Sequence, residues 1–130
     1  MKLKIYLVIL LSILLVISHS VSSKDLSGFF DTSLGDFQEE LEIAQEEGKQ
    51  GIMLFFEMDE CPFCHWMKTN VLNKPEVQSS FKKDFKVFAV DIEGDIEITD
   101  FKGNVTTEKD FAFKQFRVRA TPVIAFFDLK

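Results

Sequence analysis

Apolar and polar positions divide this chain into an apolar leader and a series of short helix and strand signals. The basic residues Lys2 and Lys4 precede an almost unbroken apolar run from Ile5 to Ile17, and small serines follow between residues 18 and 23. This order is typical of a secretory signal peptide. The run is shorter than the roughly 20 apolar residues that cross a bilayer, so an uncleaved anchor is the weaker alternative. We predict a cleaved signal peptide at 1–23 and one domain at 24–130.

The first helix signal after the leader is amphipathic. Leu34, Phe37, Leu41 and Ala44 recur at helical spacing, with glutamates on the opposite face. Such a stripe predicts a helix that packs one side on a core, and Gly48 is a suitable residue to end it. We expect the glutamates to form a solvated face.

Three apolar runs predict strands. Ile52 to Phe56 lacks alternation, which suits a strand buried on both faces of a sheet, and the run ends at Glu57. Residues 85–90 form a second, mostly apolar strand, and Val123 to Phe127 form a third. Helix signals between the first two strands favour a parallel crossover. The expected fold class is therefore an α/β sheet with flanking helices.

Helices and a short excursion fill the segments between these strands. A helix is expected from Cys61 to Leu72, and another begins with Pro75 at its first position. Glycines in residues 92–105 mark turns, so Ile96, Ile98 and Phe101 are expected to pair in a hairpin. Thr107 and Asp110 have the spacing of a capping box that opens a helix through Phe116.

The strongest chemical signal is the run Cys61-Pro62-Phe63-Cys64, which holds the only two cysteines of the chain. A thiol at the start of a helix meets unpaired N–H groups and the positive end of the helix dipole, which lower its pKa. Cys61 is thus the expected nucleophile, and Cys64, nearly one helical turn later, is placed to resolve a mixed disulfide. Phe63 and Trp66 are expected to provide packing and groove surface.

A structural disulfide is the alternative to a redox pair. Structural disulfides are common in oxidising compartments, so the predicted export of the chain is compatible with one. A bridge across two intervening residues, however, closes a very short loop and removes little entropy from the unfolded chain. The spacing from Cys61 to Cys64 therefore favours a redox function.

These motifs together resemble the thioredoxin fold. The resemblance consists of a strand, C-P-F-C at a helix start, and a later Thr121-Pro122 before a strand. More narrowly, the stretches 91–103 and 117–122 are similar to those of SoxW-like exported thioredoxins. It implies that Cys61 attacks, that Cys64 resolves, and that a cis Thr121–Pro122 bond shapes a groove for protein disulfide substrates. It also implies no metal and no cofactor beyond the redox-active disulfide.

Two residues near the cysteines are candidates for active-site support. Thioredoxins carry a buried carboxylate in the strand before the cysteines, whereas here Phe55 stands six positions before Cys61. Glu57 is the acid nearest to the Phe55 position, and it is either a proton acceptor for Cys64 or a solvated carboxylate at the strand end. His65 flanks the active-site turn, and its positive charge when protonated would favour the thiolate of Cys61.

Two rival functions remain open from the sequence. Cys61-x-x-Cys64-His65 is also the spacing of a c-type haem attachment site, with His65 as axial ligand and Met53, Met58 or Met67 opposite. The second rival is an inactive binding domain. The thioredoxin fold normally adds another antiparallel strand and a final helix after the strand led by Pro122, so we expect a C-terminally incomplete domain. A zinc site is disfavoured because Cys61, Cys64 and His65 supply only three ligands.

Charge limits the partners. The 15 basic and 21 acidic residues give a net charge of −6, and loss of Lys2 and Lys4 with the leader changes it to −8. No lysine or arginine cluster is large enough for a nucleic-acid surface, so we expect no nucleic-acid partner. The expected partners are protein thiols and disulfides, with a membrane thiol carrier as electron donor. The expected location is the periplasm or another extracytoplasmic space, without stable membrane insertion after cleavage.

Overall fold

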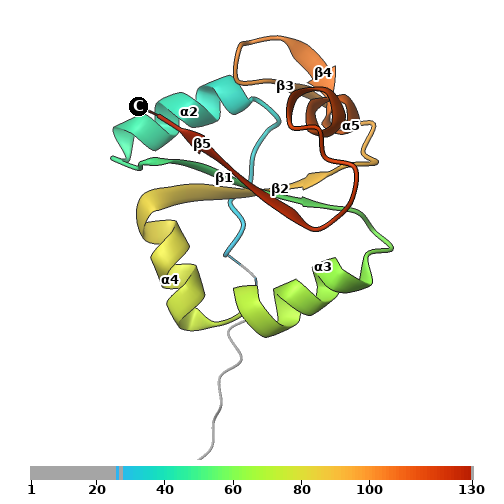
Figure 1. Ribbon diagram of the computed structural model, residues 1–130. Coiled ribbons are helices and arrows are strands. Elements are labelled where there is room, and N and C mark those ends of the chain that lie inside the picture. Colours follow the sequence, from blue (N-terminus) through green and yellow to red (C-terminus); the bar gives the residue numbers. More distant parts are fainter. Residues whose placement is uncertain (1–25, 27, 130) are drawn as a thin grey trace, which may run out of the picture.

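A computed structural model describes residues 26 and 28–129 of the chain. The predicted signal peptide lies outside these residues. Within them, none of the helices has both the length and the apolar character that a membrane span requires. The helices and strands follow one another in this order (Figure 1): α2 (Phe37–Glu46), β1 (Gly51–Glu57), α3 (Pro62–Met67), the π-helix η1 (Lys68–Leu72), α4 (Pro75–Asp84), β2 (Phe85–Asp91), β3 (Glu97–Thr99), β4 (Val105–Thr107), α5 (Glu108–Asp110), the π-helix η2 (Phe111–Gln115) and β5 (Val123–Asp128).

A mixed three-stranded sheet forms the centre of the domain. Its strand order is β2-β1-β5; β1 runs parallel to β2 and antiparallel to β5. Leu54 in the middle of β1 lies opposite Phe88 on one side and Ala125 on the other. The parallel pair is joined through α3 and α4, as the two apolar runs separated by helix signals predict. The predicted α/β fold class is thus confirmed.

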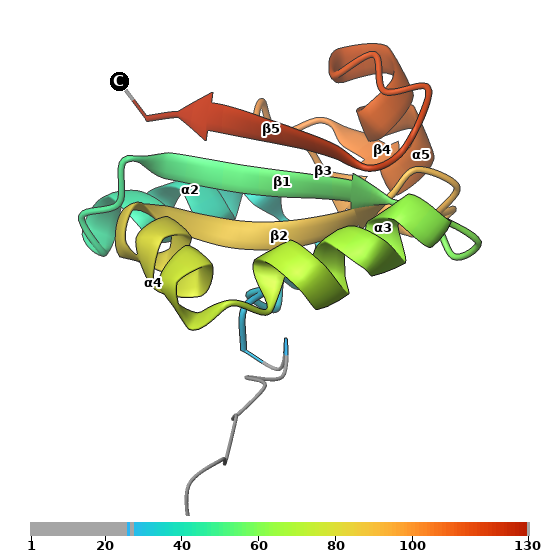
Figure 2. The ribbon, with the colours of Figure 1, turned by 60° about the horizontal axis from the view of Figure 1, so that its bottom comes forward.

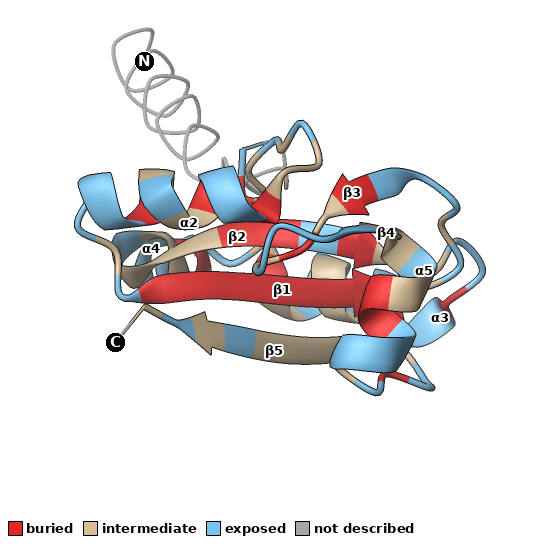
Figure 3. Ribbon diagram, turned by 90° about the horizontal axis from the view of Figure 1, so that it is seen from above, coloured by how far each residue is buried: buried red, intermediate tan, exposed pale blue. Residues whose placement is uncertain are grey.

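Helices cover both faces of this sheet (Figure 2). On one face, Ile52, Leu54 and Phe56 of β1 pack in a cluster with residues of α2, β3 and η2. On the other face, Met53 and Phe55 pack in a second cluster with residues of α3 and η1. Strand β1 is therefore buried along almost its whole length, as Figure 3 shows. Its uninterrupted apolar sequence follows from this position, because each face of the strand has its own core.

The helix α2 begins later than the sequence spacing indicates. Leu34 was expected to share the apolar face of this helix, but its side chain is 97% exposed and the helix starts at Phe37. The reason is the carboxylate of Asp36, whose Oδ1 accepts hydrogen bonds from the backbone N–H groups of Gln38 and Glu39, both at 3.0 Å. This N-cap fixes the first turn of the helix. The predicted end of the helix near Gly48 is confirmed, since α2 ends at Glu46.

The excursion after β2 forms a hairpin, but of the three residues expected to pair only Ile98 does so. Strands β3 and β4 pair antiparallel, whereas Ile96 precedes β3. Phe101 lies in the turn between the strands and stacks on Phe127 at 4.1 Å between ring centroids. Asp100 organises this turn. Its carboxylate accepts hydrogen bonds from the backbone N–H groups of Lys102 and Asn104 at 2.8 and 2.9 Å. The turn is thus set by a buried carboxylate that competes with further strand pairing.

Two predicted helix starts are confirmed. Helix α4 has Lys74 at its N-cap and Pro75 in its first turn, where the missing N–H of proline costs no hydrogen bond. At α5, Thr107 Oγ1 accepts a hydrogen bond from the Asp110 backbone N–H at 3.2 Å, which is half of the expected capping box. The helix continues as η2, which places Phe111 in the core with no exposed surface.

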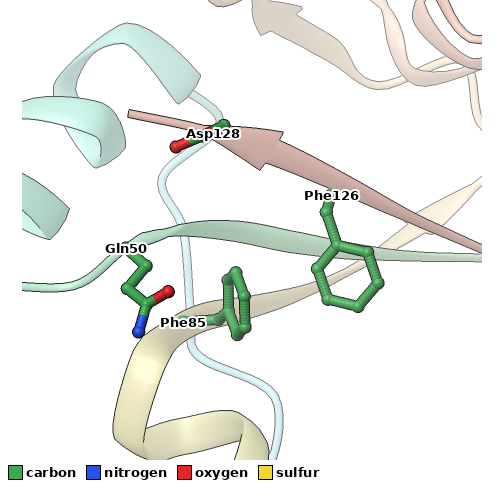
Figure 4. A pocket seen from close by; sticks show the side chains of 4 residues that line it. All are labelled: Gln50, Phe85, Phe126 and Asp128. Atoms are coloured by element: carbon green, nitrogen blue, oxygen red, sulfur yellow. The ribbon is translucent and has the colours of Figure 1, made fainter. Parts of the chain in front are cut away.

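The sheet end at which β1 begins and β5 finishes carries a small pocket. It has a volume of about 200 Å³ and is lined by Gln50, Phe85, Phe126 and Asp128 (Figure 4). The rings of Phe85 and Phe126 lie 5.0 Å apart, and Phe126 is 52% exposed. In the part of the chain that the structure describes, the sheet has β1 on one side of β5 and no strand on the other.

Candidate active site

The two cysteines lie at the opposite end of the sheet, where β1 finishes. The chain leaves β1 at Glu57, turns, and enters α3 immediately after Cys61. The sulfurs of Cys61 and Cys64 are joined in a disulfide of 2.04 Å, with 5.2 Å between the Cα atoms. The strand and helix predicted from the sequence therefore place the pair at a strand-to-helix junction.

Cys61 is the N-cap of α3. Its backbone is extended, and its Sγ accepts a hydrogen bond from the backbone N–H of Cys64 at 3.0 Å. A second donor comes from a distant part of the chain: the hydroxyl of Thr121 lies 3.2 Å from the same sulfur. After reduction, both donors face a position where negative charge develops. Charge-assisted hydrogen bonds of this kind stabilise a thiolate more than a neutral thiol.

Both cysteines are buried. Cys61 is 6% exposed and Cys64 is 2% exposed, and both belong to the second core cluster, with Phe55 and Leu72. The position of Cys61 at the N-cap of α3 distinguishes the two sulfurs. The division into an attacking Cys61 and a resolving Cys64 stays a prediction.

Thr121 and Pro122 lie directly beside this pair. Their peptide bond is cis, as the resemblance implied, and β5 begins at the next residue, Val123. Figure 2 shows α3 and α5 at this same end of the sheet, with the start of β5 between them. The Thr121 hydroxyl is the contact that ties this segment to Cys61.

Glu57 makes an ion pair with Lys68 in η1, and their side chains are 21% and 27% exposed. The ammonium group of Lys68 also lies 5.7 Å and 5.8 Å from the ring centroids of Phe30 and Phe55. Glu57 is therefore neither a freely solvated carboxylate nor an unpaired buried one. Its proposed function as proton acceptor for Cys64 stays a prediction.

The ends of β1 and β2 are joined at this end of the sheet, and the carboxyl groups of Asp91 and Glu108 lie close to this junction. The backbone N–H of Ile92, just after β2, donates to the Glu57 carbonyl at 2.9 Å, which joins the ends of β1 and β2. Nearby, burial and the negative charge of Asp91 raise the pKa of the Glu108 carboxyl, against the lowering effect of a backbone hydrogen bond from Asp91.

Exposed apolar side chains follow Cys61 in helix α3. Phe63 is 74% exposed and Trp66 is 56% exposed. Together with Pro62 they line an open depression of about 430 Å³. His65 is exposed between them, and its backbone N–H donates to the Cys61 carbonyl at 3.1 Å. His65 thus flanks the active-site turn, and the expectation that Phe63 and Trp66 provide groove surface stays a prediction.

The burial of Cys64 disfavours a haem attachment site at this cysteine pair. A thioether at Cys64 would place a porphyrin edge at a side chain that is 2% exposed and packed against Met53, Phe55 and Leu72. Both sulfurs would also have to leave the disulfide and turn toward a common open space. Among the residues described by the structure, no three or more His, Cys, Asp or Glu side chains gather closely enough to hold a metal ion.

Sequence reasoning found the cysteines and the Thr121–Pro122 segment but missed two contacts of this site. The hydroxyl of Thr121 reaches Cys61 across 60 positions of sequence. Lys68 pairs with Glu57 only because η1 returns over the end of β1. The spacing from Cys64 to Lys68, one helical turn, is the signal that could have drawn attention to the lysine.

Comparison with known proteins agrees with this arrangement. The family model of the thioredoxin-like domain matches residues 37–130. The solution structure of a thioredoxin from Thermus thermophilus is similar, with a TM-score of 0.52, 29% identical residues, and coverage of 73% of this chain and 65% of that one. The chain thus spans less than two thirds of that thioredoxin. No curated protein matches the chain. The family match, the fold and the cysteine pair lead to one conclusion: this chain belongs to the thioredoxin-like domain family.

Proposed function

We propose that this chain is an exported thiol-disulfide oxidoreductase that reduces disulfides in other proteins. The observation that carries the proposal is the environment of the Cys61 sulfur. It receives hydrogen bonds from the Cys64 backbone N–H and the Thr121 hydroxyl at 3.0 and 3.2 Å, and its disulfide partner Cys64 is buried. An N-cap sulfur with two donors is the arrangement that favours a thiolate nucleophile.

The reaction starts from the dithiol form. The Cys61 thiolate attacks one sulfur of the substrate disulfide, forms a mixed disulfide, and releases the other substrate sulfur as a thiolate, which takes up a proton. Cys64 then loses its proton and attacks the Cys61 sulfur. This step forms the Cys61–Cys64 disulfide and releases the second substrate thiol. In total, two electrons and two protons pass from the dithiol to the substrate.

Two features support proteins rather than small disulfides as substrates. The open depression formed by Pro62, Phe63 and Trp66 offers apolar surface on the helix that begins after Cys61. Thr121 contacts the Cys61 sulfur and precedes a cis proline, and the resemblance to thioredoxins implies that this segment shapes the substrate groove. Large exposed apolar patches of this kind mark interaction sites.

The direction of the reaction and its electron source rest on the resemblance to SoxW-like exported thioredoxins. That resemblance favours reduction, with a membrane thiol carrier as the donor that regenerates the dithiol. The reduction potential, measured in a series of thiol redox buffers, tests the direction. A reductase requires a potential near the value of about −270 mV that is typical of thioredoxin, whereas a value near −120 mV indicates a disulfide donor.

Export rests on the leader at residues 1–23. Expression of the full chain with a C-terminal tag, followed by cell fractionation and N-terminal mass spectrometry, tests it. Cleavage near Ser20 to Ser23, in protein from the extracytoplasmic fraction, is the expected result. An intact leader in the cytoplasm would refute export and leave the redox proposal in place.

Reduction of insulin by the purified protein, with a supplied dithiol donor, tests the activity itself. We expect turnover with the wild type and none with Cys61→Ser, while circular dichroism shows both proteins folded. Equal turnover in the two proteins would mean that the dithiol mechanism is wrong. A folded wild type without turnover would favour an inactive binding domain, and a visible absorption band would favour haem.

A further inference from the structure

A groove of about 410 Å³ lies along the outer edge of β2. Strand β2 is the last strand on its side of the sheet, since β1 lies on one side of it and no described strand lies on the other (Figure 2). The groove is bordered by β2, by the segment before α2 and by the excursion after β2, and its lining includes Asp31, Leu34, Phe88, Ala89, Ile96 and Glu108. We call it the β2-edge groove.

Alternate residues of β2 turn their backbone N–H and C=O groups toward this outer edge. Val87 shows the direction. Its carbonyl accepts a hydrogen bond from the Asp31 backbone N–H at 2.7 Å, and its own N–H donates to the Asp31 carboxylate at 2.8 Å. The backbone groups of successive strand residues point to opposite sides of the strand. Those of Ala89 and Asp91 therefore face the same outer edge as those of Val87.

Carboxylates cover this edge on both sides of Ala89. At Val87 the covering group is the Asp31 carboxylate. At Asp91 it is Glu108, whose carboxyl accepts a hydrogen bond from the Asp91 backbone. Ala89 lies between them and is exposed, and no residue that the structure describes forms a hydrogen bond with it on the outer side of β2. One N–H and one C=O group of the edge are thus open to a partner strand.

Apolar side chains line the groove beside Ala89. Leu34 is 97% exposed and Ile96 is 69% exposed, and both line the groove together with the nearly buried Phe88. A large apolar side chain that entered the groove would remove apolar surface of Leu34 and Ile96 from water, as well as its own. The groove therefore favours a partner with an apolar residue opposite Ala89.

The charged residues that line the groove, Asp31 and Glu108, are both acidic. Asp31 is partly neutralised by Lys82, which lies 3.2 Å away. The adjoining residues 91–97 contribute four further acids and no lysine or arginine, and the whole chain has a net charge of −6. Charge complementarity therefore favours a basic partner over an acidic one, and over a second copy of this acidic chain.

From the open edge, the apolar lining and the charge we infer that the β2-edge groove binds an extended basic segment of a partner protein, which joins the sheet as a further strand. Its apolar residue lies opposite Ala89. The two carboxylates cover positions two residues on either side of Ala89, so the segment carries lysine or arginine two positions before and after its apolar residue. This inference goes beyond disulfide reduction, because no thiol takes part in the binding.

A cysteine-free peptide tests the inference. The probe is Ser-Lys-Thr-Leu-Thr-Lys-Ser, acetylated and amidated at its ends. One comparison peptide has serine in place of leucine, and another has glutamate in place of both lysines. NMR of the isotope-labelled protein in its disulfide form locates the binding site, and the fluorescence anisotropy of labelled peptides gives the dissociation constants.

We expect the backbone amide of Ala89 to shift on addition of the probe and to become protected from hydrogen exchange. Replacement of leucine by serine should weaken binding about tenfold, and replacement of both lysines by glutamate should weaken it at least about tenfold. Ala89→Pro removes the outward N–H but no hydrogen bond to β1, and should weaken binding about fivefold. Ala89→Val keeps the N–H and is its control.

A second pair of variants tests the groove without a change in the backbone of β2. Ile96→Ser removes one apolar side chain from the lining and should weaken binding of the probe about fivefold. Val105→Ser is the matched control, because Val105 is 66% exposed in the same hairpin and does not line the groove. This pair decides the question even if Ala89→Pro fails to fold.

Three results would overturn the inference. The first is no binding of the probe at millimolar concentration, or equal affinity for the lysine and glutamate peptides. The second is a set of NMR shifts confined to α3, which would place the peptide at the cysteine end. The third is a shift of Ala89 when the protein alone is concentrated, which would assign the edge to a second copy. None of these results would change the reduction of insulin, so the proposed function would stand.

Discussion

The two ends of the central sheet both expose aromatic side chains, yet they differ in their chemistry. At one end, Phe126 is 52% exposed beside Phe85 and borders a pocket of about 200 Å³. At the other end, Phe113 is 50% exposed, but here the Cys61 sulfur and its two hydrogen-bond donors lie at the same strand ends. Exposure of an aromatic ring is therefore similar at the two ends. The two ends differ because only the second carries a sulfur that accepts two hydrogen bonds, one from α3 and one from the segment before β5.

This difference shows how the fold concentrates function. The loop after β1, the end of β2 and the segment before β5 all meet at the cysteine end, because β1 and β2 run parallel and β5 runs back. Residues far apart in sequence thus contribute to one site, as at the strand ends of many α/β sheets. At the opposite end, the ring of Phe126 contacts those of Phe81 and Phe85, and the Gln50 backbone joins α4 and the end of β5 by hydrogen bonds to Asp84 and Leu129.

The largest expected effect is on the resolving thiol. Cys64→Ser leaves Cys61 able to attack but removes the group that releases the substrate, so turnover should fall to the rate of the donor alone. The variant should accumulate a mixed disulfide with a protein substrate, visible by non-reducing electrophoresis and mass spectrometry. Cys61→Ser should accumulate none. If Cys61→Ser formed the adduct instead, the assignment of the two thiols would be reversed.

The second effect compares the stability of the two ends. Phe111 has no exposed surface and stacks on Phe37 at 5.2 Å, so Phe111→Ala should lower the free energy of unfolding by about 3–5 kcal/mol. Phe126→Ala, at a half-exposed site, should lower it by about 1 kcal/mol. Urea unfolding followed by circular dichroism measures both. Equal losses would contradict the burial difference on which the comparison depends.

The third effect concerns the hydroxyl at the cysteine end. Thr121→Val keeps the shape of the side chain and removes the donor 3.2 Å from the Cys61 sulfur. Loss of one hydrogen bond to a charged group should raise the pKa of the Cys61 thiol. At a pH below 7, both the thiolate fraction and the rate of alkylation should then fall about tenfold. Thr121→Ser, which retains a hydroxyl, is the control and should stay near the wild-type rate. An unchanged alkylation rate in Thr121→Val would show that the Thr121 hydroxyl does not stabilise the Cys61 thiolate.

A smaller effect involves Asp100 in the hairpin that covers one face of the sheet. Burial alone would raise its pKa, but hydrogen bonds from Asn104, Lys102 and Gln115 lower it overall. A carboxyl with a lowered pKa stabilises the fold above its unfolded-state pKa of about 3.9, and this stabilisation disappears as the pH falls through the lower folded-state value.

Asp100→Asn should therefore cost about 1 kcal/mol of unfolding free energy at pH 7 and progressively less at acidic pH below 4. Urea unfolding of the wild type and of Asp100→Asn, at pH 7 and at a pH below 4, measures how much unfolding free energy the substitution costs at each pH. Asp95→Asn, at an exposed position in the same excursion, is the control and should change neither value. A loss at Asp100 that is the same at both pH values would show that the charge does not contribute.

Much of this architecture could be predicted from local pattern. The continuous apolar run of β1 predicts a strand with a core on each face, and Pro75 predicts the start of α4. The cysteine spacing and Thr121–Pro122 indicate the site before any contact is known. These features depend on residues that are near one another in sequence, where periodicity and backbone preference decide the outcome.

Other features depend on contacts that local pattern does not contain. Leu34 has the spacing of a helical residue, but the Asp36 side chain caps the helix and excludes it. Phe101 has a strand-like position, but the hydrogen bonds to Asp100 create a turn there. The stacking of Arg119 on Phe113 exists only after η2 and the segment before β5 come together.

The most direct test of the central claim is the pH dependence of alkylation of the two reduced thiols, resolved by peptide mass spectrometry. We expect Cys61 to react first at every pH. Its midpoint should lie at least about one pH unit below the value of about 8.5 for an ordinary thiol, while Cys64 stays protected. Equal reactivity of the two cysteines, or an ordinary midpoint for Cys61, would contradict the claim that this end of the sheet activates one sulfur and shields the other.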